Sequence, residues 1–248
     1  RWYSIAYILG ILLGWIYIKK IISNKKKSFF NLVSEKTFDN LLVYLILGII
    51  IGGRLGYVVV YNFQYYFYNF LEIFAIWNGG MSFHGGLLGV IIATYIFGKK
   101  NKIDFLKIAD LIACASPIGI FFGRIANFIN GELYGKISNL PWSVIFPNSD
   151  NFARHPSQIY EAFLEGVVLF IVINFIALKK NAILKTGLVS SLFLIFYSIL
   201  RMIGEIFREP DEQIGYFLNF LSMGTILSLI TIFIGIALFL NTKKNEKI

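Results

Sequence analysis

The chain has 248 residues, of which 57% are hydrophobic and only 15% are charged, with a mean hydropathy of +0.69 and a formal net charge of +9. Ordinary soluble domains have about 25% charged residues, so this chain has too few charges to cover a water-soluble surface. Disorder and disulfide scaffolds are excluded too, because the sequence has 25 phenylalanines and one cysteine. The composition is typical of an all-α integral membrane protein.

Apolar segments of about 20 residues, the length that crosses a bilayer as a helix, occur seven times. They predict helices at 2–18, 40–61, 82–98, 106–124, 158–178, 186–206 and 216–240. Lys19 and Lys20 follow the first segment without a small-residue cleavage site, which favours a retained helix over a signal peptide. We expect one polytopic membrane domain over residues 1–248, with a short extracytoplasmic segment at about 125–157.

Lysines mark alternate loops of this arrangement. Sixteen of the 17 lysines follow the first, third, fifth and seventh predicted helices, and the exception is Lys136. The positive-inside rule predicts that these loops and the C-terminus are cytoplasmic, and that the N-terminus and the 125–157 segment lie outside. Since the positive charge follows a membrane pattern, it does not indicate a nucleic-acid partner.

Arginines, by contrast, avoid the predicted cytoplasmic loops. Arg54, Arg124 and Arg201 follow the cytoplasmic starts of their helices by 14 to 18 residues, which places each roughly 20–27 Å along its helix. The third helix runs the other way, so His84 in its first turn shares the same outer layer. Charged groups at this depth normally face a cavity or a partner.

Three guanidinium groups at headgroup depth suggest an anionic ligand, and a lipid phosphate is the nearest one. Arginine binds phosphate through paired hydrogen bonds that lysine cannot make. Two simpler interpretations stay open: each arginine extends to the interface, or it pairs with a helix acid. The consistent use of lysine elsewhere favours the phosphate site.

Four glycines bracket the histidine in the segment Gly79-Gly80-Met81-Ser82-Phe83-His84-Gly85-Gly86. Glycine permits unusual backbone angles and close approach, and leaves room beside a ligand. Histidine exchanges protons near neutral pH, which suits acid–base chemistry. The alternative is a structural histidine that donates to a nearby carbonyl.

Polar residues also continue two of the helices. Arg124 and Asn127 share a face if the fourth helix persists, and Glu132 lies in a glycine-flanked turn beyond it. On the sixth helix a stripe spaced by four contains Tyr197, Arg201 and Glu205, where Glu205 would orient Arg201 or form a simple intrahelical pair. Cys114 is most simply a core residue.

Several enzyme signatures are absent from the sequence. There is no Gly-x-Ser-x-Gly elbow and no Walker A motif, and two histidines are too few for a histidine-rich metal centre. We therefore expect neither a metal ion nor a cofactor.

The motifs together resemble those of the prolipoprotein diacylglyceryl transferase family of bacterial inner membranes. The resemblance runs nearly end to end, and its carriers are Arg1-Trp2-Tyr3, Gly52-Gly53-Arg54-Leu55-Gly56-Tyr57, Met81–Leu87, Gly123–Gly135, Arg154-His155-Pro156-Ser157-Gln158-Ile159-Tyr160-Glu161, Phe207-Arg208-Glu209-Pro210-Asp211 and Ser222-Met223-Gly224. It implies a multi-pass enzyme of the bacterial cytoplasmic membrane whose active site faces the extracytoplasmic side. Its partners would be phosphatidylglycerol, other membrane lipids, and preprolipoprotein signal peptides with a lipobox cysteine.

The resemblance also implies roles for particular residues. His84, Arg124 and Arg201 would be catalytic. The phosphatidylglycerol site would contain Arg124, Arg201, Arg54, Tyr3, Asn127, Glu132, Gly135, Tyr197, Glu205 and Arg208. The short stretch between Gly135 and Arg154 argues against a large independent head domain.

Two other classes of function compete with a transferase. An anionic-phospholipid transporter or scramblase would bind headgroups without chemistry, but transporters often have two related halves, and no internal duplication is visible. A structural scaffold would not need arginines at matched depth. For the transferase, the group that deprotonates the thiol stays open between His84 and another group or water.

Overall fold

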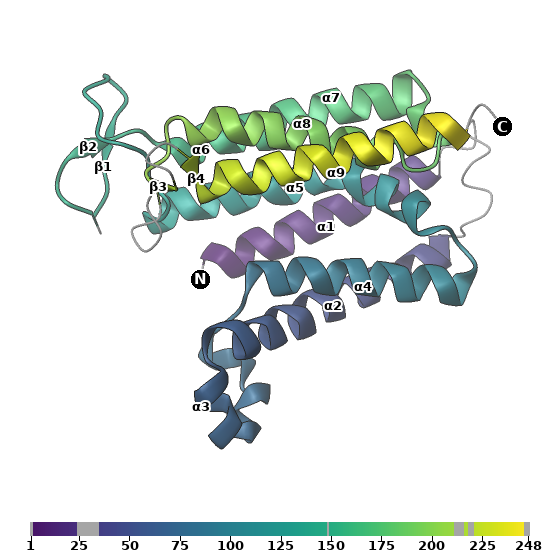
Figure 1. Cartoon of the computed structure of the whole chain (residues 1–248), viewed down its shortest axis with the longest axis horizontal. Coiled ribbons are helices and arrows are strands. Elements are labelled where there is room, and N and C mark those ends of the chain that lie inside the picture. The colour runs from purple at the N-terminus through teal and green to yellow at the C-terminus, as the bar shows by residue number, and fades with distance from the viewer. Residues whose placement is uncertain (1, 24–34, 148, 211–215, 218–220, 246–248) are drawn as a thin grey trace. The chain divides into compact units, whose positions relative to one another are not determined.

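The computed structural model describes residues 2–23, 35–147, 149–210, 216–217 and 221–245, which are mostly helical (Figure 1). They group into a large unit, Arg1–Ile21 with Ala109–Ile248, and a small unit, Ile22–Ile108. The single domain expected from the sequence stays a prediction. Some residues that carried sequence predictions lie outside the described ones, namely Arg1, Lys25, Lys26, Lys27, Asp211 and Lys247.

All seven predicted helices are present as helices. Their bounds are α1 Trp2–Ile22, α2 Glu35–Tyr61, α4 Phe83–Asn101, α5 Phe105–Asn130, the run α6 Ser157–Glu161, η4 Ala162–Val168, α7 Leu169–Asn174 and η5 Phe175–Lys179, then α8 Leu188–Glu205 and α9 Met223–Asn245. The fourth predicted helix continues to Asn130 rather than ending at 124. The last begins at Met223 rather than 216, because strand β3 (Tyr216–Phe217) first pairs antiparallel with β4 (Leu221–Ser222).

Six of these helices are long and apolar enough to span a membrane, among the residues that the structure describes. The exception is α4, whose glycines, histidine and terminal lysines dilute its apolar residues. The expected count of seven spans is therefore not confirmed. Large apolar side chains such as Val60, Phe233 and Ile8 are more than half exposed, as expected for helices that contact lipid.

The large unit contains its helices side by side, with α8 along α9 (Figure 1). Asp110 on α5, which is fully buried, accepts hydrogen bonds from the backbone N–H groups of Gly187 and Ser190, each at 2.7 Å. These are orphan donors of the α8 N-terminus, and a carboxylate there satisfies them as an N-cap would. Asp110 thus fixes the start of α8 against α5.

A short β-hairpin lies between α5 and α6. Strand β1 (Val144–Ile145) pairs antiparallel with β2 (Ala153–Arg154), with Val144 opposite Arg154. The sequence analysis predicted helices only and did not predict the two small sheets, because strands of two residues leave no periodic pattern in the sequence. The η6 turn (Ala182–Leu184) joins η5 to α8.

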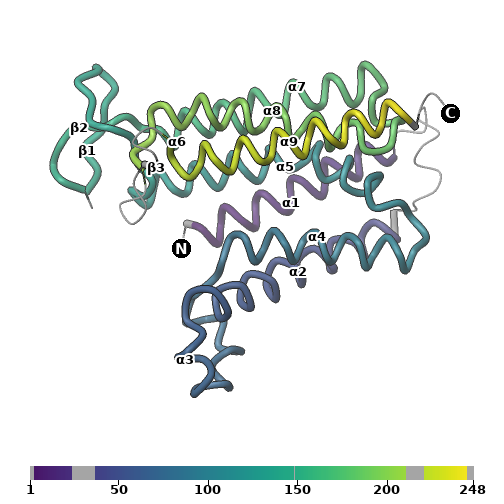
Figure 2. Tube along the Cα trace, in the orientation of Figure 1, coloured from purple at the N-terminus to yellow at the C-terminus, as the bar shows by residue number. Residues whose placement is uncertain are grey.

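In the small unit, α2 and α4 lie side by side (Figure 2). Gly48, Gly52 and Gly56 on α2 face Gly85 and Gly89 on α4. A Cβ atom on Gly48 would lie 2.6 Å from the Gly89 carbonyl oxygen, and one on Gly56 would lie 2.7 Å from the Gly85 Cα. Small residues spaced by four allow such backbone contact between helices in membranes. The close approach of Gly85 is therefore to another helix.

Candidate active site

Glu161 and Glu165 are fully buried in the run that begins with α6. Pro156 occupies the N-cap position of α6, and the chain passes after Glu161 into the π-helical segment η4, which contains Glu165. π-Helical turns inside α-helices are frequent at functional sites. The spacing of four directs both carboxylates to the same neighbours, on α5 and α8.

Arg124 on α5 contacts both carboxylates. Its Nη1 lies 2.8 Å from Glu161 Oε2, and its Nη2 donates to Glu165 Oε2 at 2.9 Å. Its side chain is 15% exposed.

Arg201 on α8 contacts the same two carboxylates and a third. Its Nη1 donates to Glu161 Oε1 at 2.6 Å and to Glu165 Oε1 at 3.4 Å, and its Nη2 lies 2.7 Å from Glu205 Oε2. Its Nε donates no hydrogen bond within the described part of the chain. The expected Arg201–Glu205 contact is present, and Glu161 and Glu165 add to it.

Arg208 completes this arginine–glutamate cluster, with its Nη1 3.8 Å from Glu161 Oε1. We define the cluster by Arg124, Arg201, Arg208, Glu161, Glu165 and Glu205, whose three positive and three negative formal charges cancel. Buried charges are tolerated only when they are paired and hydrogen-bonded. The cluster meets this condition, and it holds the two arginines side by side with part of each side chain still accessible.

A second polar group joins α1 to the end of α5. Asn127 Nδ2 donates to Tyr3 Oη at 2.6 Å, and Tyr3 Oη donates to Glu132 Oε2 at 2.5 Å. The turn that returns Glu132 contains Gly131 at φ +67°, in the left-handed region that favours glycine. The Nε2 of Gln158, one turn before Glu161, donates to the Glu132 carbonyl at 2.7 Å. The turn therefore brings Glu132 back to Tyr3 and Gln158.

Gly135 lies where three segments cross. It forms an antiparallel bridge with Arg208, and its N–H donates to the His155 carbonyl at 2.9 Å. A Cβ atom there would lie 2.6 Å from the His155 Cβ and from the Phe207 carbonyl oxygen. Glycine is thus required for the chain to bring Arg208 toward Glu161.

Arg154 holds the same crossing together. Its Nη1 donates to the Gly135 carbonyl at 3.1 Å, its Nη2 lies 2.6 Å from Asp150 Oδ2, and its guanidinium lies 4.8 Å above the Tyr134 ring. The hydrogen bond from Arg154 holds the pKa of the Asp150 carboxyl below its usual range. This buried arginine is therefore a structural part of the loop.

Tyr197 lies one turn before Arg201 on α8, with its ring 5.8 Å from that of Phe193. One turn after Arg201, the Glu205 carboxylate packs against Gly224 of α9, where a Cβ atom would lie 2.6 Å from Oε1. Because α8 is unbroken from Leu188 to Glu205, the spacing of four places Tyr197, Arg201 and Glu205 along one side of it.

The small unit holds the other two predicted site residues. His84 is the second residue of α4, after Ser82, whose hydroxyl caps the helix by accepting from the Gly85 N–H at 3.2 Å. The histidine is exposed, with its ring 5.6 Å from that of Phe83. Arg54 is buried, and its guanidinium donates to backbone carbonyl groups of residues 72–80.

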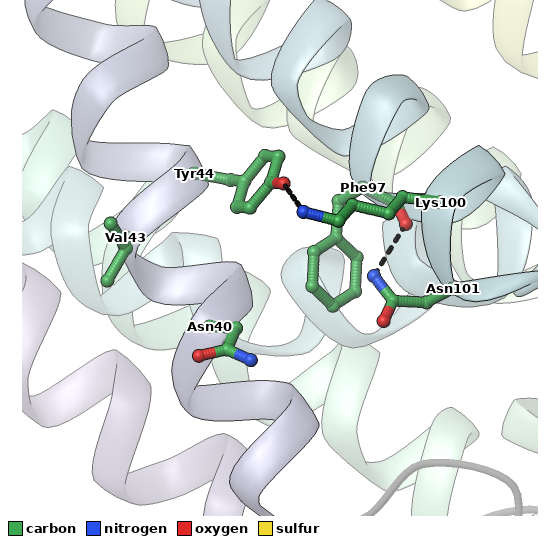
Figure 3. A pocket seen from close by; sticks show the side chains of 6 residues that line it. All are labelled: Asn40, Val43, Tyr44, Phe97, Lys100 and Asn101. Carbon is green, nitrogen blue, oxygen red and sulfur yellow. Dashed lines mark hydrogen bonds between the residues drawn. The ribbon is translucent and has the colours of Figure 1, made fainter.

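A cavity of about 290 Å³ lies between α2 and α4 in the small unit (Figure 3). Lys100 Nζ donates to Tyr44 Oη across it at 3.2 Å. Its wall is completed by Asn40, Val43, Phe97 and Asn101. Since Phe97 follows His84 by 13 residues on α4, this cavity is roughly 20 Å along the helix from the histidine.

Glu161 and Glu165 were missed as site residues. The sequence does contain an indication of their role. The two acids lie four residues apart in an apolar predicted helix, and no lysine or arginine follows them in that helix before Lys179. Such acids need positive partners from other helices. Arg124 and Arg201 pair with helix acids, the simpler alternative to a ligand site, whereas Arg54 pairs with backbone carbonyl groups. No group of three His, Cys, Asp or Glu side chains suited to a metal occurs among the described residues.

Apolar helices that enclose a charged cluster define a multi-pass membrane protein with a polar site among its spans. A sequence model described as prolipoprotein diacylglyceryl transferase matches residues 1–241. A Rickettsia bellii protein named phosphatidylglycerol–prolipoprotein diacylglyceryl transferase is 54% identical over 242 residues, which cover 98% of this chain and 90% of that protein. A Rickettsia felis protein of the same name is 53% identical over 234 residues, covering 94% and 89%. The chain belongs to the prolipoprotein diacylglyceryl transferase family, so the resemblance noted in the sequence is confirmed. Family membership favours a transferase and gives no support to a transporter.

Proposed function

We propose that this protein transfers the diacylglyceryl group of phosphatidylglycerol to the lipobox cysteine of a preprolipoprotein signal peptide. The curated relatives are named for these two substrates. The observation that carries the proposal for this chain is the pair Arg124 and Arg201, held side by side by two shared buried carboxylates.

The reaction is a substitution at the carbon of the diacylglyceryl group that bears the phosphate. The cysteine sulfur forms a bond to this carbon, while the bond from the carbon to the phosphate oxygen breaks and its electron pair leaves with glycerol phosphate. The phosphodiester carries one negative charge, whereas a phosphate monoester carries about 1.5–2 at pH 7. Negative charge therefore grows on the leaving group.

Arg124 and Arg201 are placed to stabilise this growing charge. Donors that are already oriented toward the charge are most effective in a site from which water is excluded. Among the described residues the Nε–H of Arg201 is not used by the cluster, which leaves it for a phosphate oxygen. Arg208, Tyr3, Asn127, Glu132, Gly135, Tyr197 and Glu205 would bind the lipid or support the two arginines.

The thiol must lose its proton, because thiolate is the nucleophile. His84 is our proposed catalytic histidine, since it lies exposed at the start of α4 and an imidazole nitrogen can accept or donate a proton. It acts either as the base or as a donor that orients the lipid, and the His84→Asn experiment in the Discussion separates these roles.

We place the protein in the bacterial cytoplasmic membrane, with its site on the extracytoplasmic side. The alternation of lysine-rich loops supports this orientation.

The direct test uses the purified full chain, phosphatidylglycerol vesicles and a lipobox peptide, followed by mass spectrometry of the peptide. We expect a mass increase of one diacylglyceryl group on the cysteine, and none on a matched peptide with serine at that position. Lipid binding or movement between leaflets without peptide modification would contradict the transferase and favour a transporter.

A further inference from the structure

The connection between α2 and α4, residues 62–82, has almost no core of its own. It consists of α3 (Phe63–Tyr68) and two 3₁₀ turns, η2 (Phe70–Phe74) and η3 (Ile76–Asn78). Leu71 is 81% and Trp77 80% exposed, and neither 3₁₀ turn contains a buried residue. Among its apolar residues only Tyr66 and Ala75 are buried, so apolar packing alone does not account for the shape of this segment.

The Arg54 side chain supplies the missing contacts. Its Nε donates to the Ile73 carbonyl at 2.8 Å; its Nη1 donates to Gly79 at 2.6 Å and Gly80 at 3.2 Å; its Nη2 donates to Glu72 at 2.6 Å and Ala75 at 3.3 Å. A guanidinium has five N–H donors, so these five carbonyl groups use all of them. We call this arrangement the carbonyl clamp.

The surroundings of the Arg54 guanidinium leave it little freedom to move. Arg54 is 4% exposed, and its guanidinium carbon lies 5.0 Å from the centre of the Tyr66 ring. Gly80 has φ +78°, and a Cβ atom there would lie 2.9 Å from Arg54 Nη1 and 2.6 Å from the Tyr57 ring. A side chain at position 80 would therefore collide with the guanidinium.

The clamp leads directly to His84. Its last acceptors are Gly79 and Gly80, and the N–H of Ser82, the N-cap of α4, donates to the Gly53 carbonyl beside Arg54 at 2.9 Å. His84 follows this N-cap by two residues. Arg54 and its neighbour thus fix the chain up to the point at which the histidine is presented.

We propose that Arg54 is a positioning residue for the transfer reaction: it acts through the carbonyl groups of residues 72–80 to hold the start of α4, and does not contact the lipid phosphate. The proposal rests on the proposed function, in which His84 is catalytic. It revises the expectation from the sequence that Arg54 binds phosphatidylglycerol, because its donors are already used.

The test compares variants of the full-length protein in detergent with two readouts, steady-state kinetics and chymotrypsin cleavage within residues 62–78. Lysine at position 54 keeps the charge but cannot reach five carbonyl groups from one nitrogen. We expect Arg54→Lys to lower kcat by roughly 10²-fold, the cost of a small misplacement of a catalytic group. Its KM for phosphatidylglycerol should stay within about twofold, and cleavage at the exposed aromatic residues should accelerate.

Two further variants separate the clamp from the charge. Gly80→Ala displaces the guanidinium while Arg54 is retained, so it should reproduce the loss of kcat and the faster cleavage. Glu72→Gln is the matched control: Arg54 binds the backbone oxygen of Glu72, whose side chain is instead bonded to Tyr65. Glu72→Gln should leave both readouts unchanged.

Two outcomes would overturn the proposal. A several-fold higher KM for phosphatidylglycerol in Arg54→Lys, with unchanged cleavage, would mean that Arg54 contacts the phosphate. Faster cleavage with unchanged kcat would mean that the segment does not serve the reaction. If the wild-type protein transfers no diacylglyceryl group, the proposed function fails instead, and the cleavage comparison still shows whether the clamp exists.

Discussion

At the residue scale, Glu161 and Glu165 compensate two guanidinium groups that would repel each other inside the helix bundle. Each carboxylate contacts both Arg124 and Arg201, at distances from 2.6 to 3.4 Å, so the two arginines share the same two anions. A phosphate that enters the site meets donors whose orientation is already fixed.

The paired geometry of arginine predicts that lysine cannot replace it. Arg124→Lys and Arg201→Lys each keep the positive charge but lose the second donor that contacts a carboxylate or a phosphate. We expect either variant to lose most of its transfer activity, measured with phosphatidylglycerol and a lipobox peptide. Near-normal turnover in both would refute the paired hydrogen bonds.

Removal of one carboxylate should reveal an unfilled anion position. Glu165→Gln leaves Arg124 and Arg201 with less negative charge, and breaking a buried ion pair in this way costs about 3–5 kcal/mol. We expect a lower melting temperature in detergent, part of which phosphatidylglycerol restores because its phosphate supplies the missing charge. Glu72→Gln, at a partly exposed carboxylate outside the cluster, is the control. An equal response to the lipid in variant and wild type would argue against a phosphate beside the arginines.

One substitution separates the two proposed roles of His84, the base and the donor that orients the lipid. His84→Asn keeps hydrogen-bonding capacity but removes the imidazole nitrogen that could accept a proton. If His84 is the base, this variant should still bind phosphatidylglycerol while turnover falls by roughly 10²-fold or more. Its residual rate should rise with pH as the thiol ionises unaided. Turnover within a few-fold of wild type would exclude the base and leave the lipid-orienting role.

At the element scale, α2 and α4 contact each other through backbone where Gly48, Gly52 and Gly56 meet Gly85 and Gly89. The glycines around His84 therefore have two functions. Gly79 and Gly80 adopt φ +83° and +78°, which few other residues adopt, whereas Gly85 lets α4 approach α2.

This backbone contact predicts a strong position dependence of glycine substitution. Gly48→Ala would place a methyl group 2.6 Å from the Gly89 carbonyl oxygen, and overpacking of this kind costs about 1–3 kcal/mol. Gly119→Ala on α5 is the matched control, because a Cβ atom there meets no other group within 4 Å. Thermal unfolding should show a loss for the first variant and none for the second. Equal melting temperatures would contradict the tight packing of α2 on α4.

At the scale of the whole molecule, the sequence predicts most of the helices and the arginines of the arginine–glutamate cluster, but not its buried acids Glu161 and Glu165. Apolar runs predicted the helices because the bilayer imposes their length. The spacing of Arg124 and Asn127 became meaningful because α5 persists to Asn130. The carbonyl clamp was not predictable, since its acceptors are backbone atoms that any sequence supplies. The short turns at 63–78 were missed because an aromatic-rich stretch without a period gives no signal for them.

The lysine pattern makes a prediction about orientation that covers the entire chain. Asn139 lies exposed in the 131–156 connection, which the positive-inside rule places outside, whereas Lys180 follows η5 in a loop placed in the cytoplasm. We expect a membrane-impermeant thiol reagent to label Asn139→Cys in intact spheroplasts and Lys180→Cys only after lysis.

The single native cysteine should not interfere with this labelling experiment. Cys114 is fully buried, so it should react in neither condition, and the unsubstituted chain serves as the control. Exported preproteins present their cysteine on the outer side of the membrane. Within the 131–156 connection, Gly135 forms a bridge with Arg208 of the arginine–glutamate cluster. Labelling of Asn139→Cys only after lysis would place this end of the large unit in the cytoplasm. The proposed site would then face away from its peptide substrate, and the assignment of sides from lysine would be wrong.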